Sequence, residues 1–261
     1  MDFQDKINEL RKKDIQNFQT NYFMNEINEK SIYFENDNAV TVLQKEKTFH
    51  KLYYAFCDLS AFEELLTKLP NKEIYLEIIS KKEIDVQVKN VIEKFFTYQT
   101  TYQKLYKKLT LTEDKISQKY HADMDLIYQK LYSTFDIRFE HLMKKNEIQE
   151  LIDKNQIITI YENNELKSFI IYKIQGNKAY LNQIANYGNK DNLINLWKLF
   201  YQELNNKGIT YVDLWYNKLN KKAENMYKIE QFQPLNMFNF CYKKYNHSVR
   251  SIVLPPSTTI C

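Results

Sequence analysis

The spacing of hydrophobic residues alternates along the chain between two periods. Apolar residues three or four positions apart are typical of one face of a helix, whereas short alternating or continuous apolar runs are typical of strands. These patterns predict helices at 3–29, 61–69, 86–96, 123–143, 146–153, 191–207 and 222–232, strands at 31–36, 39–46, 49–58, 73–79, 97–109, 209–217 and 237–245, and three antiparallel strands within 156–187.

Polar and turn-forming residues separate these elements. Asn163–Asn164 and Gln175–Gly176–Asn177 predict two hairpin turns. Ser60 and Asp191 each predict the N-cap of a helix, because a short polar side chain there accepts hydrogen bonds from free backbone N–H groups. Gly208 predicts the residue that ends the long helix of the second half.

The order of the predicted elements repeats. Residues 1–109 give αβββαβαβ and residues 115–245 give ααβββαβαβ, with the polar stretch 110–115 as the boundary. This order indicates an internal duplication. We therefore expect an α+β protein of two units, each a mixed, mostly antiparallel sheet flanked by helices. The segment 246–261 differs in composition and predicts an extended or disordered tail.

Composition excludes several classes of site. With 3 glycines in 261 residues, the chain has no Gly-rich phosphate loop. The net charge of +4 is small and evenly mixed, which argues against DNA as a partner. Cys57, Cys241 and Cys261 are too far apart for a disulfide framework or a zinc site, and 4 scattered histidines predict no metal site. No apolar run approaches the roughly 20 residues of a membrane span, so we expect a cytoplasmic protein.

The most specific pattern lies near the C-terminal end. Asn220, Ala223, Tyr227 and Phe232 directly follow the apolar strand predicted at 209–217. Ala223 and Tyr227 are four residues apart, so they share one face of the predicted helix.

This stretch resembles the N-x-x-A-x-x-x-Y-x-x-x-G-F pattern that follows the fifth strand in the GNAT superfamily of acyl-CoA-dependent N-acyltransferases. Gln231 departs from the family's glycine. The order of elements in 123–245 is similar to that of the family, and both halves together look like a tandem GNAT arrangement with a more diverged first copy. The resemblance covers most of the chain in topology and a short C-terminal stretch in residues.

The resemblance implies chemistry for this stretch. The family's tyrosine donates a proton to the leaving CoA thiolate, which makes Tyr227 the candidate catalytic residue, and a phenol is neutral at working pH. The family's asparagine contacts the cofactor arm, which points to Asn220. Acetyl-CoA or another acyl-CoA would be the cofactor. In a chain with 21 tyrosines, a packing role for Tyr227 stays open.

The family's second signature, R/Q-x-x-G-x-G/A, opens the helix after strand four, where backbone N–H groups hold the CoA pyrophosphate. The matching positions here are Gly188, Asn189, Asp191 and Leu193, and none keeps the expected residue type. Asp191 also places a negative charge where the pyrophosphate would lie. The resemblance implies cofactor contacts from Ile184, Ala185, Gly188, Asn189, Lys190, Asn192, Asn220 and Ala223.

The general base is not evident from the pattern. The family often uses a glutamate on strand four, where this chain has Asn182 and Gln183, and neither amide accepts a proton at neutral pH. In the first half, CDLSAFEELL replaces the pyrophosphate loop, so we expect no cofactor site there and a role as scaffold or as one wall of an acceptor cleft. Candidate bases elsewhere are Glu140, His141, Glu162 and Asp213.

Three functions are compatible with the sequence. The first is an N-acyltransferase that moves an acyl group, in the first place acetyl, from acyl-CoA or an acylated carrier to an amine of a small molecule or peptide. The second is a non-catalytic GNAT-like binding or interaction module. The third is an aminoacyl-tRNA-dependent transferase, like the peptidoglycan-bridge enzymes. We expect no DNA or membrane partner, and a homodimer stays open.

Overall fold

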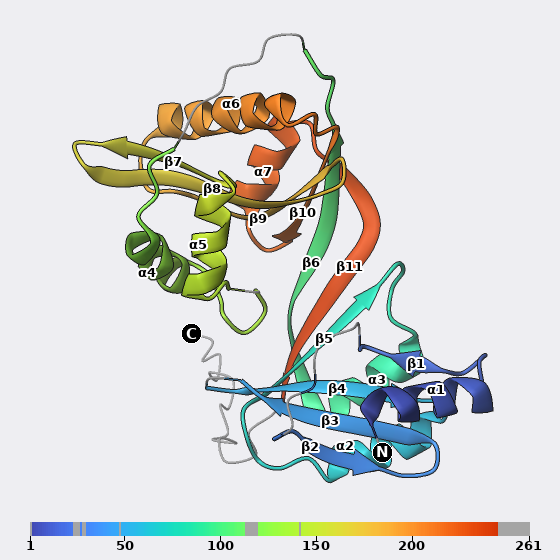
Figure 1. The fold of residues 1–261 in the computed structure, drawn as a ribbon. Coiled ribbons are helices and arrows are strands. Elements are labelled where there is room, and N and C mark those ends of the chain that lie inside the picture. Colours follow the sequence, from blue (N-terminus) through green and yellow to red (C-terminus); the bar gives the residue numbers. More distant parts are fainter. Residues whose placement is uncertain are drawn as a thin grey trace, which may run out of the picture. The chain divides into compact units, whose positions relative to one another are not determined.

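A computed structural model describes residues 2–22, 27, 30–46, 48–112, 120–140 and 142–244 (Figure 1). The chain forms two compact units that interleave in sequence, with 79–82 and 100–239 in the second unit and the other described residues in the first. The predicted division into a diverged GNAT-like half at 1–109 and a GNAT-like domain at 115–245 stays a prediction. Residues 113–115 of the predicted boundary, His141 and the tail at 246–261 lie outside the described residues.

The first unit is an α+β unit whose strands follow the order β2-β3-β4-β5. Pairing is antiparallel between β2, β3 and β4, and parallel between β4 and β5. Side chains of β4 alternate, with Tyr53 and Ala55 packing against α1, and Tyr54 and Phe56 packing against α2. Its elements are α1 (Phe3–Lys13), β1 (Gln19–Thr20), β2 (Ile32–Glu35), β3 (Ala39–Lys45), β4 (His50–Phe56), α2 (Leu59–Thr67), β5 (Ile74–Ser80) and α3 (Val86–Phe95).

The second unit has the strand order β6-β10-β9-β8-β7. All its neighbouring strands are antiparallel except β9 and β10. In Figure 1, α6 and α7 lie on one side of these strands and α4 and α5 on the other. It holds most of β6 (Phe96–Lys108) and of β11 (Gln233–Lys244), whose residues 96–99 and 240–244 belong to the first unit. Its other elements are α4 (Met124–Thr134), α5 (Lys145–Asp153), β7 (Ile157–Glu162), β8 (Glu165–Gln175), β9 (Lys178–Asn186), α6 (Lys190–Asn206), β10 (Tyr211–Asn217) and α7 (Lys221–Ile229).

The predicted strands are confirmed to within a few residues, and so are the turns between them. Asn163, Asn164 and Gly176 adopt positive φ angles of 51°, 63° and 61° in the two hairpin turns. Gly208, with φ 67°, ends α6 as predicted. Gln231 adopts φ 61° after α7, a left-handed conformation that a glycine adopts at lower cost.

The first predicted helix, at 3–29, is wrong from Asp14 to Tyr22, and most of 23–29 lies outside the described residues. Asp14 ends the helix because its Oδ1 accepts hydrogen bonds from Gln16 N and Asn17 N, at 3.1 and 3.2 Å. This local turn competes with the helical hydrogen-bond ladder.

The predicted helix at 123–143 is also too long. It ends at Thr134, because Phe135 has an extended backbone at φ −110° and ψ 151°. Asp136 then starts a turn in which its Oδ1 accepts a hydrogen bond from Arg138 N at 3.0 Å. The residues after Thr134 therefore form a loop rather than a fourth turn of helix.

Two helix starts lie earlier than predicted. Asp58, not Ser60, caps α2, and its Oδ1 accepts hydrogen bonds from Ser60 N at 2.7 Å and Ala61 N at 3.1 Å. Asn189, not Asp191, caps α6. In both helices the polar side chain two residues earlier reaches the free N–H groups of the first turn.

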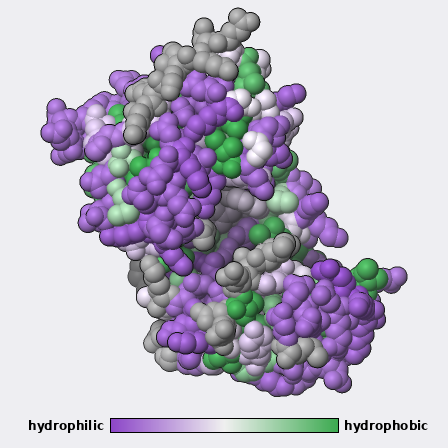
Figure 2. Space-filling view, viewed as in Figure 1, coloured by the Kyte–Doolittle hydropathy of each residue, from purple (hydrophilic) through white to green (hydrophobic). Residues whose placement is uncertain are grey.

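None of the described helices is long and apolar enough to cross a membrane. No cluster of three or more metal-ligating side chains occurs among the described residues. The face seen in Figure 2 is mostly hydrophilic, with hydrophobic residues scattered over it.

The parallel strands β4 and β5 of the first unit part after Leu52, and the unit fills this opening itself. Asn21 Nδ2 donates to Leu52 O at 2.9 Å and to Glu77 O at 3.0 Å, so it joins one strand to the other. Tyr54 N donates to Asn21 Oδ1 at 2.7 Å. One buried carboxamide thus satisfies backbone groups of both strands.

Replacing this carboxamide should destabilise the protein. Asn21→Ala leaves two buried carbonyls and one N–H without these bonds, and we expect the free energy of unfolding to fall by about 2–3 kcal/mol. Urea unfolding measures the change, and Asn17→Ala, an exposed position in the same segment, is the control. A loss no larger for Asn21→Ala than for the control would contradict this role.

Candidate functional site

The second unit contains the corresponding opening between parallel strands. β9 and β10 pair only from Tyr211↔Lys178 to Leu214↔Leu181. Beyond these pairs β9 stays with β8 and β10 stays with β6, so the two strands part. The opening exposes strand edges that can hydrogen-bond the amide groups of an extended ligand.

A β-bulge lies at the mouth of this opening. Tyr172 of β8 lies opposite Leu181, whereas Ile171 lies opposite Gln183, so Asn182 is the extra residue of β9. Bulges redirect side chains and are frequent beside active sites. Asn182 Oδ1 is buried and has no hydrogen-bond partner among the described residues, which indicates room for a donor from a ligand.

A cavity of about 1120 Å³ occupies the opening. Ligand pockets are typically about 300–1,000 Å³, so this cavity is large enough for a small-molecule ligand. Its walls come from β6, β9, β10, α7 and the loop after α4, and they include Tyr102, Glu140, Asn182, Tyr216, Asn220 and Tyr227.

Tyr227 lies between this cavity and the core. Its ring makes edge contacts with Tyr216, Trp197 and Phe232, at centroid distances of 6.0, 6.4 and 5.6 Å, which fix its orientation. Burial, and then the charge of Glu140, raise the pKa of Tyr227 above its ordinary value. The phenol is therefore neutral at working pH and can donate a proton but not act as a base.

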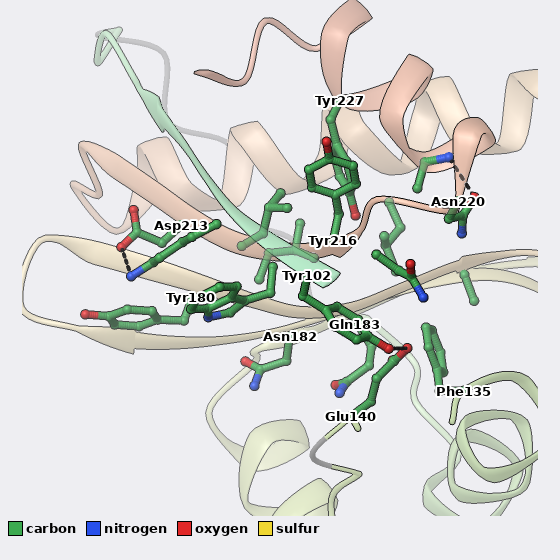
Figure 3. Close-up of a pocket in the computed structure, with 18 of the residues that line it drawn as sticks. Tyr102, Phe135, Glu140, Tyr180, Asn182, Gln183, Asp213, Tyr216, Asn220 and Tyr227 are labelled. Carbon is green, nitrogen blue, oxygen red and sulfur yellow. Dashed lines mark hydrogen bonds and ion pairs between the residues drawn. The ribbon is translucent and has the colours of Figure 1, made fainter. Parts of the chain in front are cut away.

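Glu140, in the loop after α4, faces the same cavity. Its Oε1 accepts a hydrogen bond from Tyr102 Oη at 3.2 Å, drawn as a dashed line in Figure 3. Burial raises the pKa of Glu140 to about 7, and the hydrogen bond from Tyr102 opposes that rise. A carboxylate with this pKa can take up and release a proton near neutral pH.

Tyr227 and Glu140 approach the opening from opposite sides. In Figure 3, Tyr227 comes from α7 above the strands, and Glu140 and Asn182 lie below them. The parted strands therefore allow a ligand held on the α7 side to meet a ligand held on the Glu140 side.

The other candidate bases are less well placed. Asp213 forms an ion pair with Lys104, with 3.1 Å between Nζ and Oδ2. Glu162 does not line the cavity, and its Oε1 accepts a hydrogen bond from Asn192 Nδ2 at 2.6 Å. His141 lies outside the described residues. Neither described carboxylate is free to act as a base in the cavity.

The predicted ligand contacts divide into two groups. Asn220 and Ala223 line the cavity from α7, where Ala223 N donates to Asn220 Oδ1 at 3.0 Å. Ile184 and Ala185 line it from β9. The remaining predicted contacts lie at the start of α6, outside the cavity lining: Gly188 and Asn189 precede the helix, and Lys190 and Asn192 belong to its first turn.

Four backbone N–H groups between the end of β9 and the first turn of α6 are bonded within the protein. Tyr187 N and Gly188 N both donate to Lys167 O, at 2.7 and 3.1 Å. Asn192 N donates to Asn189 Oδ1 at 3.0 Å, and Asn189 N donates to Asn192 Oδ1 at 2.9 Å. These N–H groups are thus already bonded within the protein.

Sequence reasoning missed Tyr102 and Tyr216 as cavity residues. Both lie in tyrosine-containing strands, and the pattern predicts those strands but not which tyrosine meets the opening. Only the pairing of β10 with β6, which sets Asn217 opposite Tyr102, brings them to the site.

The fold of the chain is similar to that of solved GNAT N-acetyltransferases. A GCN5-related N-acetyltransferase from Sphaerobacter thermophilus matches with a TM-score of 0.54 and 8% identity, over 80% of this chain and 81% of that one. A GNAT-family acetyltransferase from Colwellia psychrerythraea matches with a TM-score of 0.50 and 10% identity, over 94% and 98%. No protein-family model and no curated protein match the sequence. The likeness establishes the GNAT fold.

The pKa of Glu140 gives a stability prediction with a definite sign. Glu140 keeps its proton up to about pH 7 in the folded protein, against an ordinary pKa of 4.5, so the free energy of unfolding falls as pH rises between these values. Glu140→Gln cannot ionise. Relative to the wild type, the free energy of unfolding of this variant should therefore rise by on the order of 2–3 kcal/mol between pH 4 and pH 8.

Urea unfolding across this pH range measures the difference. Tyr102→Phe serves as a second variant, because loss of its hydrogen bond to the carboxylate should move the titration of Glu140 further upward. Parallel pH dependences for the wild type and Glu140→Gln would contradict the assignment.

Proposed function

We propose that the protein is an N-acyltransferase that moves an acyl group, in the first place acetyl, from an acyl thioester such as acetyl-CoA to an amine of a small molecule or peptide. The observation that carries the proposal is a single cavity, in the opening between β9 and β10, lined by both a neutral phenol at Tyr227 and a carboxylate at Glu140.

The α7 side of the opening suits the thioester donor. Its pantetheine arm is a chain of amides, which parted strand edges bind through backbone hydrogen bonds. Ile184 and Ala185 on β9, and Asn220 and Ala223 at the start of α7, lie beside that path. The small Ala223 side chain leaves room close to the helix.

The Glu140 side suits the amine. An ammonium group approaching the cavity meets a carboxylate at Glu140 and the unpartnered Oδ1 of Asn182. Glu140 takes a proton from the ammonium, which gives the neutral amine needed for attack, and later releases that proton to solvent. Its raised pKa places this exchange near neutral pH.

Tyr227 acts on the leaving sulfur. As the new C–N bond forms and the C–S bond then breaks, Tyr227 gives its proton to the thiolate. The second proton of the former amine passes to the resulting phenolate and restores Tyr227. The net reaction gives an amide, a free thiol and one proton.

A thiol-release assay with acetyl-CoA and a set of primary amines and short peptides tests this proposal. Tyr227→Phe keeps the ring contacts and should lower kcat by about 10²-fold or more, with little change in KM for acetyl-CoA. Tyr201→Phe is the matched control, because Tyr201 is a largely buried tyrosine of α6 outside the cavity.

The same assay across pH tests Glu140. Wild-type kcat/KM should rise with pH, with the midpoint of the rise at about pH 7. In Glu140→Gln this rise should be absent. Full activity in both Tyr227→Phe and Glu140→Gln would refute the mechanism. Absence of transfer and of thioester binding would favour a non-catalytic binding module.

A further inference from the structure

We propose that the acyl donor is recognised through its acylated pantetheine arm alone, and that the diphosphate of a nucleotide such as that in CoA makes no contribution to binding. This inference rests on the proposed function, since it concerns the donor of that reaction. The same arm occurs in CoA thioesters and on phosphopantetheine-bearing carrier proteins.

Four backbone N–H groups lie bonded where the strand opening meets α6. An anion binds a helix N-terminus because several backbone N–H groups there lack partners. Here the N–H groups of Tyr187, Gly188, Asn189 and Asn192 all donate to groups of the protein. Two of these hydrogen bonds go to the bulge in β8. Lys167 is the extra residue of that bulge, and its carbonyl accepts from Tyr187 N and Gly188 N.

The space beside Gly188 is filled by a side chain of the protein. The Oδ1 of Asn192 lies 2.1 Å from where a Cβ on Gly188 would be, so the carboxamide fills the concave space that this glycine creates. Asn192 is only 5% exposed. Its Nδ2 is fixed by the hydrogen bond to Glu162 at 2.6 Å. The space in which a phosphate would contact the turn is therefore occupied by a fixed side chain.

The charges at the start of α6 also disfavour a diphosphate. Asp191 lies in the first turn of α6 and Glu162 contacts Asn192, so two carboxylates lie at this helix start. Both repel a diphosphate and take its place in complementing the helix dipole. Lys190 is the one basic residue in 187–192, and its side chain is exposed.

The arm itself meets none of these obstacles. The opening between β9 and β10 continues to the cavity beside Tyr227, and its walls include Ile184, Ala185 and Ala223. The first unit offers an internal comparison, because there the amide of Asn21 bonds to both parted strands. An amide is thus a suitable ligand for such an opening, with no phosphate required.

Calorimetric titration of the full chain with CoA and with pantetheine tests the proposal. The two dissociation constants should agree within about threefold, and adenosine 3′,5′-bisphosphate should not compete with pantetheine. Binding of CoA more than about 30-fold tighter than pantetheine would overturn the inference and leave the proposed function standing. Binding of neither would instead contradict the proposed donor site itself.

Turnover distinguishes the sources of the arm. S-acetylpantetheine should match acetyl-CoA in kcat/KM within about threefold, and an acetylated acyl carrier protein that exceeds both would identify a protein-bound donor. A loss of about 100-fold with S-acetylpantetheine would contradict the inference.

A variant tests the role of Asn192. Asn192→Ala combined with Asp191→Asn frees the N–H of Asn189 and removes one carboxylate, while Asn189 still caps α6. CoA binding should strengthen relative to pantetheine by about threefold or more, with pantetheine unchanged. Asn195→Ala, at an exposed position on the same helix, is the control and should leave the ratio of the dissociation constants of CoA and pantetheine unchanged. An unchanged ratio in the double variant would contradict the assignment.

Discussion

The parting of β9 from β10 is the constraint on which the site depends. Two parallel strands that stayed paired would leave no exposed edges, no cavity between α7 and the loop after α4, and no path from one side of the strands to the other. β9 stays paired with β8 and β10 stays paired with β6, and these pairings keep the opening in place without a ligand. The packing of Tyr227 against three aromatic rings then sets a phenol at a fixed point of that opening.

The two units differ in what occupies the opening between their parted parallel strands. The first unit fills its opening with Asn21, so its parted strands are joined by a carboxamide of the chain. The second unit leaves the opening to a cavity but fills the turn beside it with Asn192. In both places an asparagine side chain occupies a position suited to a polar ligand, and the free opening of the second unit is where we place the chemistry.

Much of the fold follows from the sequence, and the reasons for the exceptions are local. Strand patterns and the turns at Asn163–Asn164 and Gly176 are predictable, because alternation and positive φ angles leave clear signals. Two helices were predicted too long, because the hydrophobic spacing continues past Asp14 and Phe135, where the backbone leaves the helix. In the site, the motif identifies Tyr227 and Asn220. It does not reveal Asn192 as the residue that fills the turn, since capping boxes and close approaches to Gly188 depend on three-dimensional contacts.

Amide hydrogen exchange with and without CoA tests the central claim most directly. With CoA bound, we expect slower exchange for the amides of β9 after Leu181 and for those in the first turn of α7. The amides of β4 should exchange at an unchanged rate, because Asn21 already bonds that strand. Protection confined to the first unit, or to the turn at 187–192 without β9, would contradict the claim that the parted strands of the second unit hold the donor.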